Sequence, residues 1–460
     1  MKQYEAFPIA ADLNRRDFIY GGSVAALMTM IAAKELAAQE KSKLAEGEAK
    51  KPVGPPLKCG VIGCGVWGRD IINTLLRLPN AQVAAVCDHY EAFLNRAKSI
   101  APDAKGYADF KELLADKNVQ AVLIATPTHQ HRAIAEAAFK AGKHVYCEAP
   151  IAHTPEDGKA IATAAKASPS SNFQSGLLMR SEPQRQFLLP FIRSGAAGKN
   201  IKARAQRHKK ESWRRAAANP EREKELNWRL DRKISTGLIG EIGIQQIDVL
   251  NWFLNTKPLS VTGFGSVVHW ADGREVPDSI VAVFEYPGGV LLTYEATLGN
   301  SFDADYEMLY GTDAAVMVRQ NKAWMFKEAD SPLLGWEVYA RKDDFYKETG
   351  IALVANATKL AALGEKPAEE VPFTNTPLFH ALDAFLYNSR LIGGAVEDFV
   401  ANFGDGDAAA LRAYLVDFAK NKMPAAGWQE GYESLVTVLK ANEAILSGKK
   451  LAFTKELFEV

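Results

Sequence analysis

Three glycines with the spacing G-x-G-x-x-G are the first residues of the chain that point to chemistry. They are Gly63, Gly65 and Gly68, and they lie between a short apolar run and a helical pattern that opens with Val66 and Trp67. In a strand–turn–helix unit, the first glycine permits a tight turn, the second admits a pyrophosphate close to the backbone, and the third lets the helix pack on the strand. Because a helix N-terminus attracts phosphate, these five residues are predicted to hold a dinucleotide.

An acid follows the second apolar strand at the position expected of a ribose ligand. The run from Gln82 to Cys87 ends in Asp88, twenty residues after Gly68. A carboxylate at this point of a dinucleotide-binding unit accepts hydrogen bonds from ribose hydroxyls, and it repels the 2′-phosphate of NADP. The expected cofactor is therefore NAD, with NADP less favoured.

Strands and helices alternate through the first part of the chain. Five apolar runs are separated by helical patterns, at residues 57–62, 82–87, 121–125, 144–147 and 173–178. This alternation predicts an α/β fold that begins with a doubly wound parallel sheet. The corresponding Rossmann domain is expected to span residues 51–177.

The pattern changes after residue 177. Strand-like runs now follow one another, at residues 260–268, 279–286, 290–298, 306–310 and 315–318. Pro287-Gly288-Gly289 is typical of a hairpin turn between two of them. Helices are expected at residues 183–193, 241–254, 379–392 and 432–446. Residues 178–460 are therefore predicted to form a C-terminal α/β domain with a large, mainly antiparallel open sheet, which serves substrate binding and oligomerisation.

The N-terminus has the features of an export signal. Arg15 and Arg16 are followed by Phe18 and by a modest apolar stretch that ends near Ala33. This combination is typical of a twin-arginine signal, so residues 1–50 are interpreted as signal peptide and linker. It predicts the twin-arginine export machinery as a partner, a periplasmic or otherwise exported protein, and no stable membrane span after processing. Since free NAD is lacking outside the cytoplasm, the cofactor is expected to stay bound and to recover its redox state in each cycle.

Charge and cysteine content exclude other classes of partner. Lys and Arg together number 55, as do Asp and Glu, so no net field attracts nucleic acid. A basic segment at residues 199–233 also contains acids, so it is expected to be a solvated strand edge with a surface loop or, functionally, a substrate-facing flap or a subunit contact. The cysteines lie in or at the end of predicted core strands and are interpreted as buried free thiols, with a disulfide as the alternative in an exported protein, and their spacing suggests no metal site. They are Cys59, Cys64, Cys87 and Cys147.

The order of these motifs, continued through Glu148-Ala149-Pro150, resembles the Gfo/Idh/MocA family of glucose-fructose oxidoreductase and inositol dehydrogenase. Further matching motifs follow at residues 192–195, 241–248 and 311–312. The resemblance implies a nicotinamide nucleotide and usually a sugar or polyol substrate. It also implies dimers or tetramers that assemble through the open sheet, so a homo-oligomer is expected.

The same resemblance assigns further cofactor contacts. Thr126 and Pro127 follow the strand at residues 121–125 and correspond to the family's loop beside the dinucleotide. His131 and Glu148 correspond to residues on the nicotinamide side. All four are therefore expected in the cofactor site.

Two positions depart from the family's catalytic pattern. The lysine of the family's E-K-P motif corresponds to Ala149, and the histidine of its D-x-G-x-H motif corresponds to Gln245, with the acid of that motif at Glu241. Alanine cannot stabilise an alkoxide, and glutamine cannot titrate. The usual proton acceptor for alcohol oxidation is therefore missing at these two positions.

Three other side chains are candidates for the proton carrier. Glu241 is the first, although an acid at the start of a helix also complements the helix dipole. His208, on the strand that enters the basic segment, is the second. His153, four residues after Ala149, is the third, with a polar helix-entry residue as the alternative.

Substrate binding is expected from Arg180, Gln245 and Asp248. Arg180 follows the strand at residues 173–178, and its guanidinium could bind hydroxyls or a carboxylate. Gln245 and Asp248 share one helix face with Glu241, because the spacing is i, i+4 and i+7. For Asp248 a structural role is favoured over a catalytic one.

Three functions fit these observations. The first is an NAD-dependent oxidoreductase that acts on a sugar or glycoside with a tightly held cofactor. The second is a redox-neutral NAD-dependent glycosidase or lyase, in which transient oxidation promotes elimination. The third is a non-catalytic nucleotide- or sugar-binding paralogue, suggested by Ala149 and Gln245.

Overall fold

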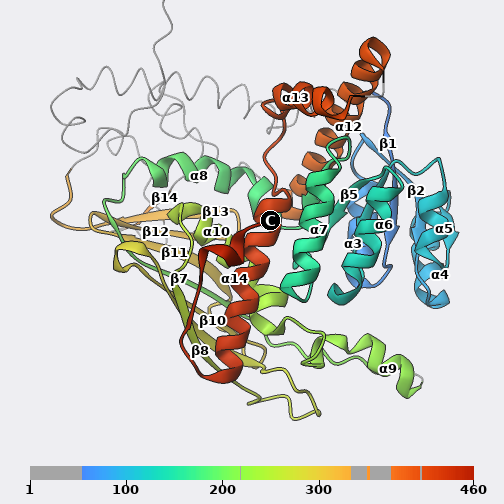
Figure 1. The fold of residues 1–460 in the computed structure, drawn as a ribbon. Coiled ribbons are helices and arrows are strands. Elements are labelled where there is room, and N and C mark those ends of the chain that lie inside the picture. The colour runs from blue at the N-terminus through green and yellow to red at the C-terminus, as the bar shows by residue number, and fades with distance from the viewer. Residues whose placement is uncertain (1–53, 218, 333–349, 353–374, 405–406) are drawn as a thin grey trace, which may run out of the picture. The chain divides into compact units, whose positions relative to one another are not determined.

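The computed structural model describes residues 54–217, 219–332, 350–352, 375–404 and 407–460 (Figure 1). The interpreted signal peptide and linker, residues 1–50, lie outside the described residues, so export remains a prediction. Two β-sheets with their helices make up the described chain. None of the helices within these ranges is both long and apolar enough to cross a membrane.

The N-terminal sheet confirms the doubly wound parallel fold. Its six strands lie in the order β3-β2-β1-β4-β5-β6, and every neighbouring pair is parallel. Their bounds are β1 (Leu57–Ile62), β2 (Ala81–Cys87), β3 (Lys105–Tyr107), β4 (Ala121–Ile124), β5 (His144–Cys147) and β6 (Phe173–Ser175). The strand order reverses between β1 and β4, which is where doubly wound sheets bind ligands at the carboxyl ends of their strands.

Local sequence signals explain where the connecting helices begin. Asp109 accepts a hydrogen bond from the backbone N–H of Lys111 (2.9 Å) at the start of α5, and Thr154 accepts one from Asp157 N–H (3.1 Å) at the start of α7. Pro155 occupies the first position of α7, where its missing N–H costs nothing. The five helices are α3 (Val66–Leu75), α4 (Glu91–Ile100), α5 (Phe110–Ala115), α6 (His131–Lys140) and α7 (Pro155–Ala167).

The second sheet confirms a large, mainly antiparallel sheet. Its strand order is β14-β13-β12-β11-β7-β10-β9-β8-β15, and the pair β7 and β10 is the parallel exception. The strands are β7 (Asn200–His208), β8 (Ser260–Ser266), β9 (Ser279–Glu285), β10 (Leu291–Thr297), β11 (Asp305–Gly311), β12 (Ala314–Arg319), β13 (Lys322–Lys327), β14 (Gly350–Ala352) and β15 (Leu451–Ala452). The sequence did not predict β13, which has lysine at both ends, or the short β3.

Further helices precede, interrupt and follow the strands of this sheet in the sequence. They are α8 (Pro183–Arg193), α9 (Pro220–Leu226), α10 (Ile244–Leu254), α12 (Pro377–Phe403), α13 (Ala408–Ala419) and α14 (Trp428–Ser447). Short turns are η1 (Thr128–Gln130), η2 (Leu178–Ser181), η3 (Trp228–Leu230), η5 (Pro287–Gly289) and η7 (Lys455–Phe458). The predicted strand at residues 173–178 is shorter, because Leu178 already starts η2. The predicted helix at residues 241–254 begins with a π-helical turn, η4 (Ile239–Gly243).

Helix α12 joins the core of the N-terminal domain, although it follows the second sheet in the sequence. Leu378, Leu382, Phe385 and Leu386 are buried with residues of β1 and α3. The helix also runs past the predicted end at Ile392. It continues because Ile392 and Ala395 pack with Leu415 of α13, a helix that the sequence analysis did not predict.

We expect Phe385→Ala to destabilise the protein by about 3–5 kcal/mol, because a fully buried ring is replaced by a cavity. Phe403→Ala in the same helix is the matched control, since Phe403 is 71% exposed, and it should cost less than about 1 kcal/mol. Urea unfolding measures both. Equal effects of the two variants would show that α12 does not belong to this core.

Candidate dinucleotide and substrate site

The glycine turn has the geometry that a dinucleotide requires. Gly63 has φ +93°, and a Cβ there would lie 2.6 Å from the carbonyl oxygen of Ala125. A Cβ on Gly68 would lie 1.8 Å from the carbonyl oxygen of Gly63, so the helix can approach the strand only with glycine at this position. Gly65 is different, because the space where its Cβ would lie is open. The turn is therefore tightly packed at Gly63 and Gly68, and it has open space beside the backbone of Gly65.

Asp88 is fixed directly beside this turn. Its carboxylate accepts hydrogen bonds from the backbone N–H groups of Cys64 (2.8 Å) and Tyr90 (2.9 Å). Val66 and Trp67, which open α3, remain 52% and 39% exposed. The structure therefore brings the predicted phosphate-side residues and the predicted ribose carboxylate together at the carboxyl ends of β1 and β2.

Several polar atoms near these strand ends fit a bound nucleotide. Helix α3 begins without a side-chain cap, which leaves its first N–H groups for an anion. Among the described residues, the buried side-chain atoms without a hydrogen-bond partner include three in the loops that follow β4 and β5: Thr126 Oγ1, His129 Nδ1 and Glu148 Oε1. Pro127 lies at the start of η1, between Thr126 and His129. Buried polar atoms are normally paired, so this group is suited to a polar ligand.

Glu148 has an unusual protonation equilibrium. Burial raises its pKa to about 7, although the neighbouring Trp67 and Tyr146 side chains act in the opposite direction. Its environment is tight, because a Cβ on Gly176 would lie 2.6 Å from Glu148 Oε2. A carboxyl that is half protonated near neutral pH can donate or accept a hydrogen bond.

His131, for which the family resemblance implies a nicotinamide-side contact, has both ring nitrogens next to backbone carbonyls, and the nicotinamide contact stays a prediction. Its ring is buried, with Nδ1 3.1 Å from the Pro150 carbonyl oxygen and Nε2 3.0 Å from the Thr126 carbonyl oxygen. Burial lowers its pKa to about 4, so the ring is neutral at pH 7. His131 therefore ties together the loops that carry Thr126 and Glu148, and it presents no exposed ring nitrogen.

A pair of histidines lies beside these loops. The ring centroids of His129 and His153 are 6.1 Å apart, and the ring centroid of Trp228, from the second domain, is also 6.1 Å from that of His129. Burial lowers the pKa of His129, and the neighbouring His153 acts in the same direction. His153 Nδ1 lies 3.5 Å from Asp157 Oδ2. Among the three predicted proton carriers, His153 is the one that the structure places next to another titratable ring.

Glu241 belongs to the same neighbourhood but is already bound. Its carboxylate accepts a hydrogen bond from Thr236 Oγ1 (2.7 Å) and pairs with Arg229 Nε at 3.3 Å. The Arg229 guanidinium in turn lies 4.6 Å from the Trp228 ring centroid. A continuous series of contacts therefore runs from His153 through His129 and Trp228 to Glu241.

Gln245 links the second domain to the loop after β6. Its Oε1 accepts a hydrogen bond from Leu178 N–H (3.0 Å), and its Nε2 donates one to the Gly176 carbonyl (2.8 Å). Since Gly176 packs on Glu148, the hydrogen bond from Gln245 to Gly176 places Gln245 near Glu148. Both ends of its amide are occupied, so it positions the loop instead of presenting a free amide.

Arg180 and Asp248, both predicted to bind substrate, bind each other in the structure, and their contact with a substrate stays a prediction. The guanidinium makes two contacts with the carboxylate, at 2.9 Å and 2.8 Å, and Ser434 Oγ donates a third hydrogen bond at 2.8 Å. Asp248 is buried, and Arg180 also lies over the ring of Trp252. The pair thus joins the turn η2 to helix α10.

His208 lies apart from the histidine pair. Its Nδ1 is 3.1 Å from the carbonyl oxygen of Phe302, in the loop between β10 and β11. No contact described for His208 joins it to Glu148, His129 or Glu241. The second predicted proton carrier is therefore not part of this cluster.

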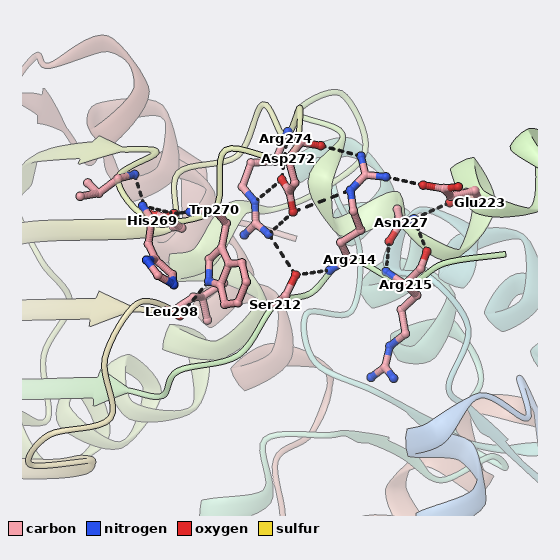
Figure 2. A network of polar contacts seen from close by, with 12 residues as sticks. Ser212, Arg214, Arg215, Glu223, Asn227, His269, Trp270, Asp272, Arg274 and Leu298 are labelled. Carbon is pink, nitrogen blue, oxygen red and sulfur yellow. Dashed lines mark hydrogen bonds and ion pairs between the residues drawn. The ribbon is translucent and has the colours of Figure 1, made fainter.

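The basic segment includes an arm that leaves β7 and returns through η3 to η4. We define the arm as residues 209–217 and 219–233. Figure 2 shows how its polar contacts fix it: Arg214 lies between Glu223 and Asp272, and Asn227 bonds to backbone atoms of Arg215. A cavity of about 510 Å³ lies beside the arm, lined by charges of both signs that include Lys224, Asp231 and Glu275.

Sequence reasoning missed His129 and Arg229. His129 stands two residues before His131, in the turn η1 of the loop that follows β4, which was a usable signal, because strand ends carry ligands in this fold. Arg229 had no such signal. Its partner Glu241 is twelve residues away and is reached only through the turns η3 and η4.

These features define a class, the two-domain oxidoreductases in which a dinucleotide-binding Rossmann domain is joined to a large open sheet. The chain belongs to the Gfo/Idh/MocA family. Residues 57–172 match the family's oxidoreductase domain with the NAD-binding Rossmann fold, and residues 190–317 match the GFO/IDH/MocA C-terminal domain. The resemblance drawn from the sequence motifs is thereby confirmed.

Named relatives share part or most of the chain. Inositol 2-dehydrogenase of Salmonella typhimurium is 29% identical over 201 residues, which are 43% of this chain and 55% of that protein. The chain therefore matches about half the length of that relative. The 2,7-anhydro-N-acetylneuraminate hydratase of Escherichia coli is 24% identical over 367 residues, 78% of this chain and 93% of that protein.

Solved structures confirm the fold. The oxidoreductase domain protein from Kribbella flavida is 19% identical, with a TM-score of 0.64 over 87% of this chain and 100% of that one. Levoglucosan dehydrogenase in complex with NADH and levoglucosan is 18% identical, with a TM-score of 0.63 over 87% of this chain and 100% of that one.

The pKa of Glu148 predicts a pH dependence of stability. In the folded protein the pKa of Glu148 is about 7, above the ordinary value of 4.5, so the protonated carboxyl favours the folded state. Its contribution to the free energy of unfolding is fully present below pH 4.5 and is lost as the pH rises through 7. Without added nucleotide, the wild-type protein should lose roughly 3 kcal/mol relative to Glu148→Gln between these values. Urea unfolding at several pH values measures the difference. The exposed Glu459→Gln is the control, and an equal pH profile for all three proteins would contradict the assignment.

Proposed function

We propose that the protein is a nicotinamide-dependent oxidoreductase that acts on a sugar or polyol. The observation that carries this proposal is the group of unpartnered polar atoms, Thr126 Oγ1, His129 Nδ1 and Glu148 Oε1, at the carboxyl ends of β4 and β5. These atoms lie next to a glycine turn and a ribose carboxylate of the geometry described above. The names of the relatives, which refer to inositol and levoglucosan, support a polyhydroxylated substrate.

The histidine pair supplies the proton chemistry in this proposal. A bound nicotinamide provides the acceptor for the hydride that leaves a carbinol carbon, and the hydroxyl proton then needs a base within reach. His153 takes this proton, and the Asp157 carboxylate, 3.5 Å from its Nδ1, favours the charged ring that results. His129, kept neutral by burial, binds the same hydroxyl. Trp228 excludes water on one side of the pair.

The preferred cofactor is NAD. Asp88 directs a carboxylate that is held by two backbone N–H groups toward the ribose position, where a 2′-phosphate would be repelled. The twin-arginine segment supports export with the nucleotide already bound, and hence slow exchange of the cofactor. The open sheet carries exposed apolar residues on neighbouring strands, Phe264, Val281 and Leu291, which support a homo-oligomer formed through this face.

Replacement of the proposed base should reduce turnover without loss of the nucleotide. His153→Ala is expected to lower kcat/KM by about 10²–10⁴-fold on a responsive sugar, and His129→Ala should act in the same direction. His269→Ala is the control, because His269 is exposed and lies in the β8–β9 connection. Absorbance of the reduced nicotinamide, recorded over a panel of sugars, polyols and glycosides, measures the reaction. Aglycone release without any net change in this absorbance would contradict an oxidoreductase.

Removal of the ribose carboxylate should weaken NADH binding. Asp88→Asn loses charge-assisted hydrogen bonds to the ribose, so the Kd for NADH should rise about 10-fold or more, and the preference over NADPH should shrink. The exposed Asp103→Asn is the matched control. Fluorescence titration with both nucleotides measures the change. An unchanged ratio of the two Kd values would show that Asp88 does not select the cofactor.

A further inference from the structure

Helix α9 belongs to the arm of the second domain but contacts the nucleotide-binding domain. The Arg222 guanidinium lies 3.9 Å from the centroid of the Tyr90 ring and 5.1 Å from that of Phe93. Glu225 Oε2 lies 3.3 Å from His89 Nε2 and accepts a hydrogen bond from Arg222 Nη1 at 2.7 Å. These contacts form one connected group across the two domains.

In the N-terminal domain, this group of contacts lies on the residues that directly follow Asp88. His89 and Tyr90 directly follow Asp88, and the Tyr90 backbone N–H holds the Asp88 carboxylate. Arg222 therefore packs on the turn that positions the predicted ribose ligand. A cation stacked on an aromatic ring and shielded from water gains more energy than an exposed one. Arg222 is shielded, since its side chain is 11% exposed.

The arm holds α9 in this position from its other side. Asn219 caps the helix by accepting a hydrogen bond from Arg222 N–H (2.8 Å). Arg214 pairs with Glu223, and Asn227 makes two hydrogen bonds with the backbone of Arg215 (Figure 2). Because α9 is anchored within the second domain, it cannot leave Tyr90 without a rearrangement of the arm or a movement between the domains.

We infer that Arg222 and Glu225 complete the adenosine side of the dinucleotide site and slow the departure of the nucleotide. Arg222 acts as a positioning residue: it clamps the turn formed by His89 and Tyr90, and thereby the Asp88 carboxylate. The Nε atom of Arg222 is buried and has no partner among the described residues, so one donor is left over on the side chain that covers this turn. The inference rests on the proposed nucleotide binding and adds to it a residue from the other domain.

The dissociation rate of NADH from the full-length protein tests this inference. Stopped-flow displacement of bound NADH by excess NAD should be at least tenfold faster in Arg222→Ala than in the wild type. Arg222→Lys keeps the charge but loses the planar group, so an intermediate rate is expected. Lys224→Ala is the matched control, because Lys224 is exposed on the same helix and makes none of these contacts.

Hydrogen exchange of α9 provides the second readout. In the wild type, NADH should slow amide exchange in residues 220–226, and Arg222→Ala should abolish this protection while the circular dichroism spectrum stays unchanged. If NADH dissociates from Arg222→Ala at the same rate as from the wild type, the inference is overturned and the proposed function stays intact. A selective effect on NADPH would also overturn it, because Arg222 would then bind the 2′-phosphate. Failure of the wild-type protein to bind either nucleotide would instead refute the proposed function.

Discussion

The buried ion pair between Arg180 and Asp248 is the interaction on which the geometry of the site depends. It joins η2, the first turn after the N-terminal sheet, to α10, and the hydroxyl of Ser434 adds α14 to the same point. A buried charge pair of this kind is costly to break from one side, because the remaining charge is left without a partner. The pair therefore fixes the position of α10 relative to the loop that follows β6.

The fixed position of α10 beside the loop after β6 explains how residues from both domains can form one site. Gln245 lies on α10 one turn before Asp248 and reaches the same loop from β6, where Gly176 packs on Glu148. Glu241 lies at the other end of the series, where a π-helical turn precedes α10. Such a turn adds a residue to the helical repeat, so Glu241 no longer follows the regular face that Gln245 and Asp248 share. Its carboxylate instead meets Thr236 and Arg229.

Features that depend on residues close together in the sequence could be predicted, whereas contacts between distant residues could not. The glycine turn, Asp88 and the parallel sheet depend on short-range spacing and on apolar periodicity, and both are visible in one chain. The pairing of Arg180 with Asp248 depends on residues 68 positions apart, so a cation and an acid that neutralise each other looked like two free ligands. Helix α12 was recognised as a helix, but no local pattern indicated that Phe385 would pack in the core of the domain that precedes it by more than two hundred residues. The series from His153 to Glu241 was likewise visible only after Trp228 and Arg229 came to lie beside it.

The chemistry of the four cysteines has a practical consequence. All are buried and none is paired in a disulfide, and burial raises the pKa of the thiols of Cys59, Cys64 and Cys87 to about 12. At neutral pH such thiols are protonated and shielded, so they react slowly with alkylating dyes. A cysteine introduced at an exposed position such as Lys224 would then be the fastest-labelled thiol of the chain. The native protein is therefore a ready background for a single fluorescent reporter.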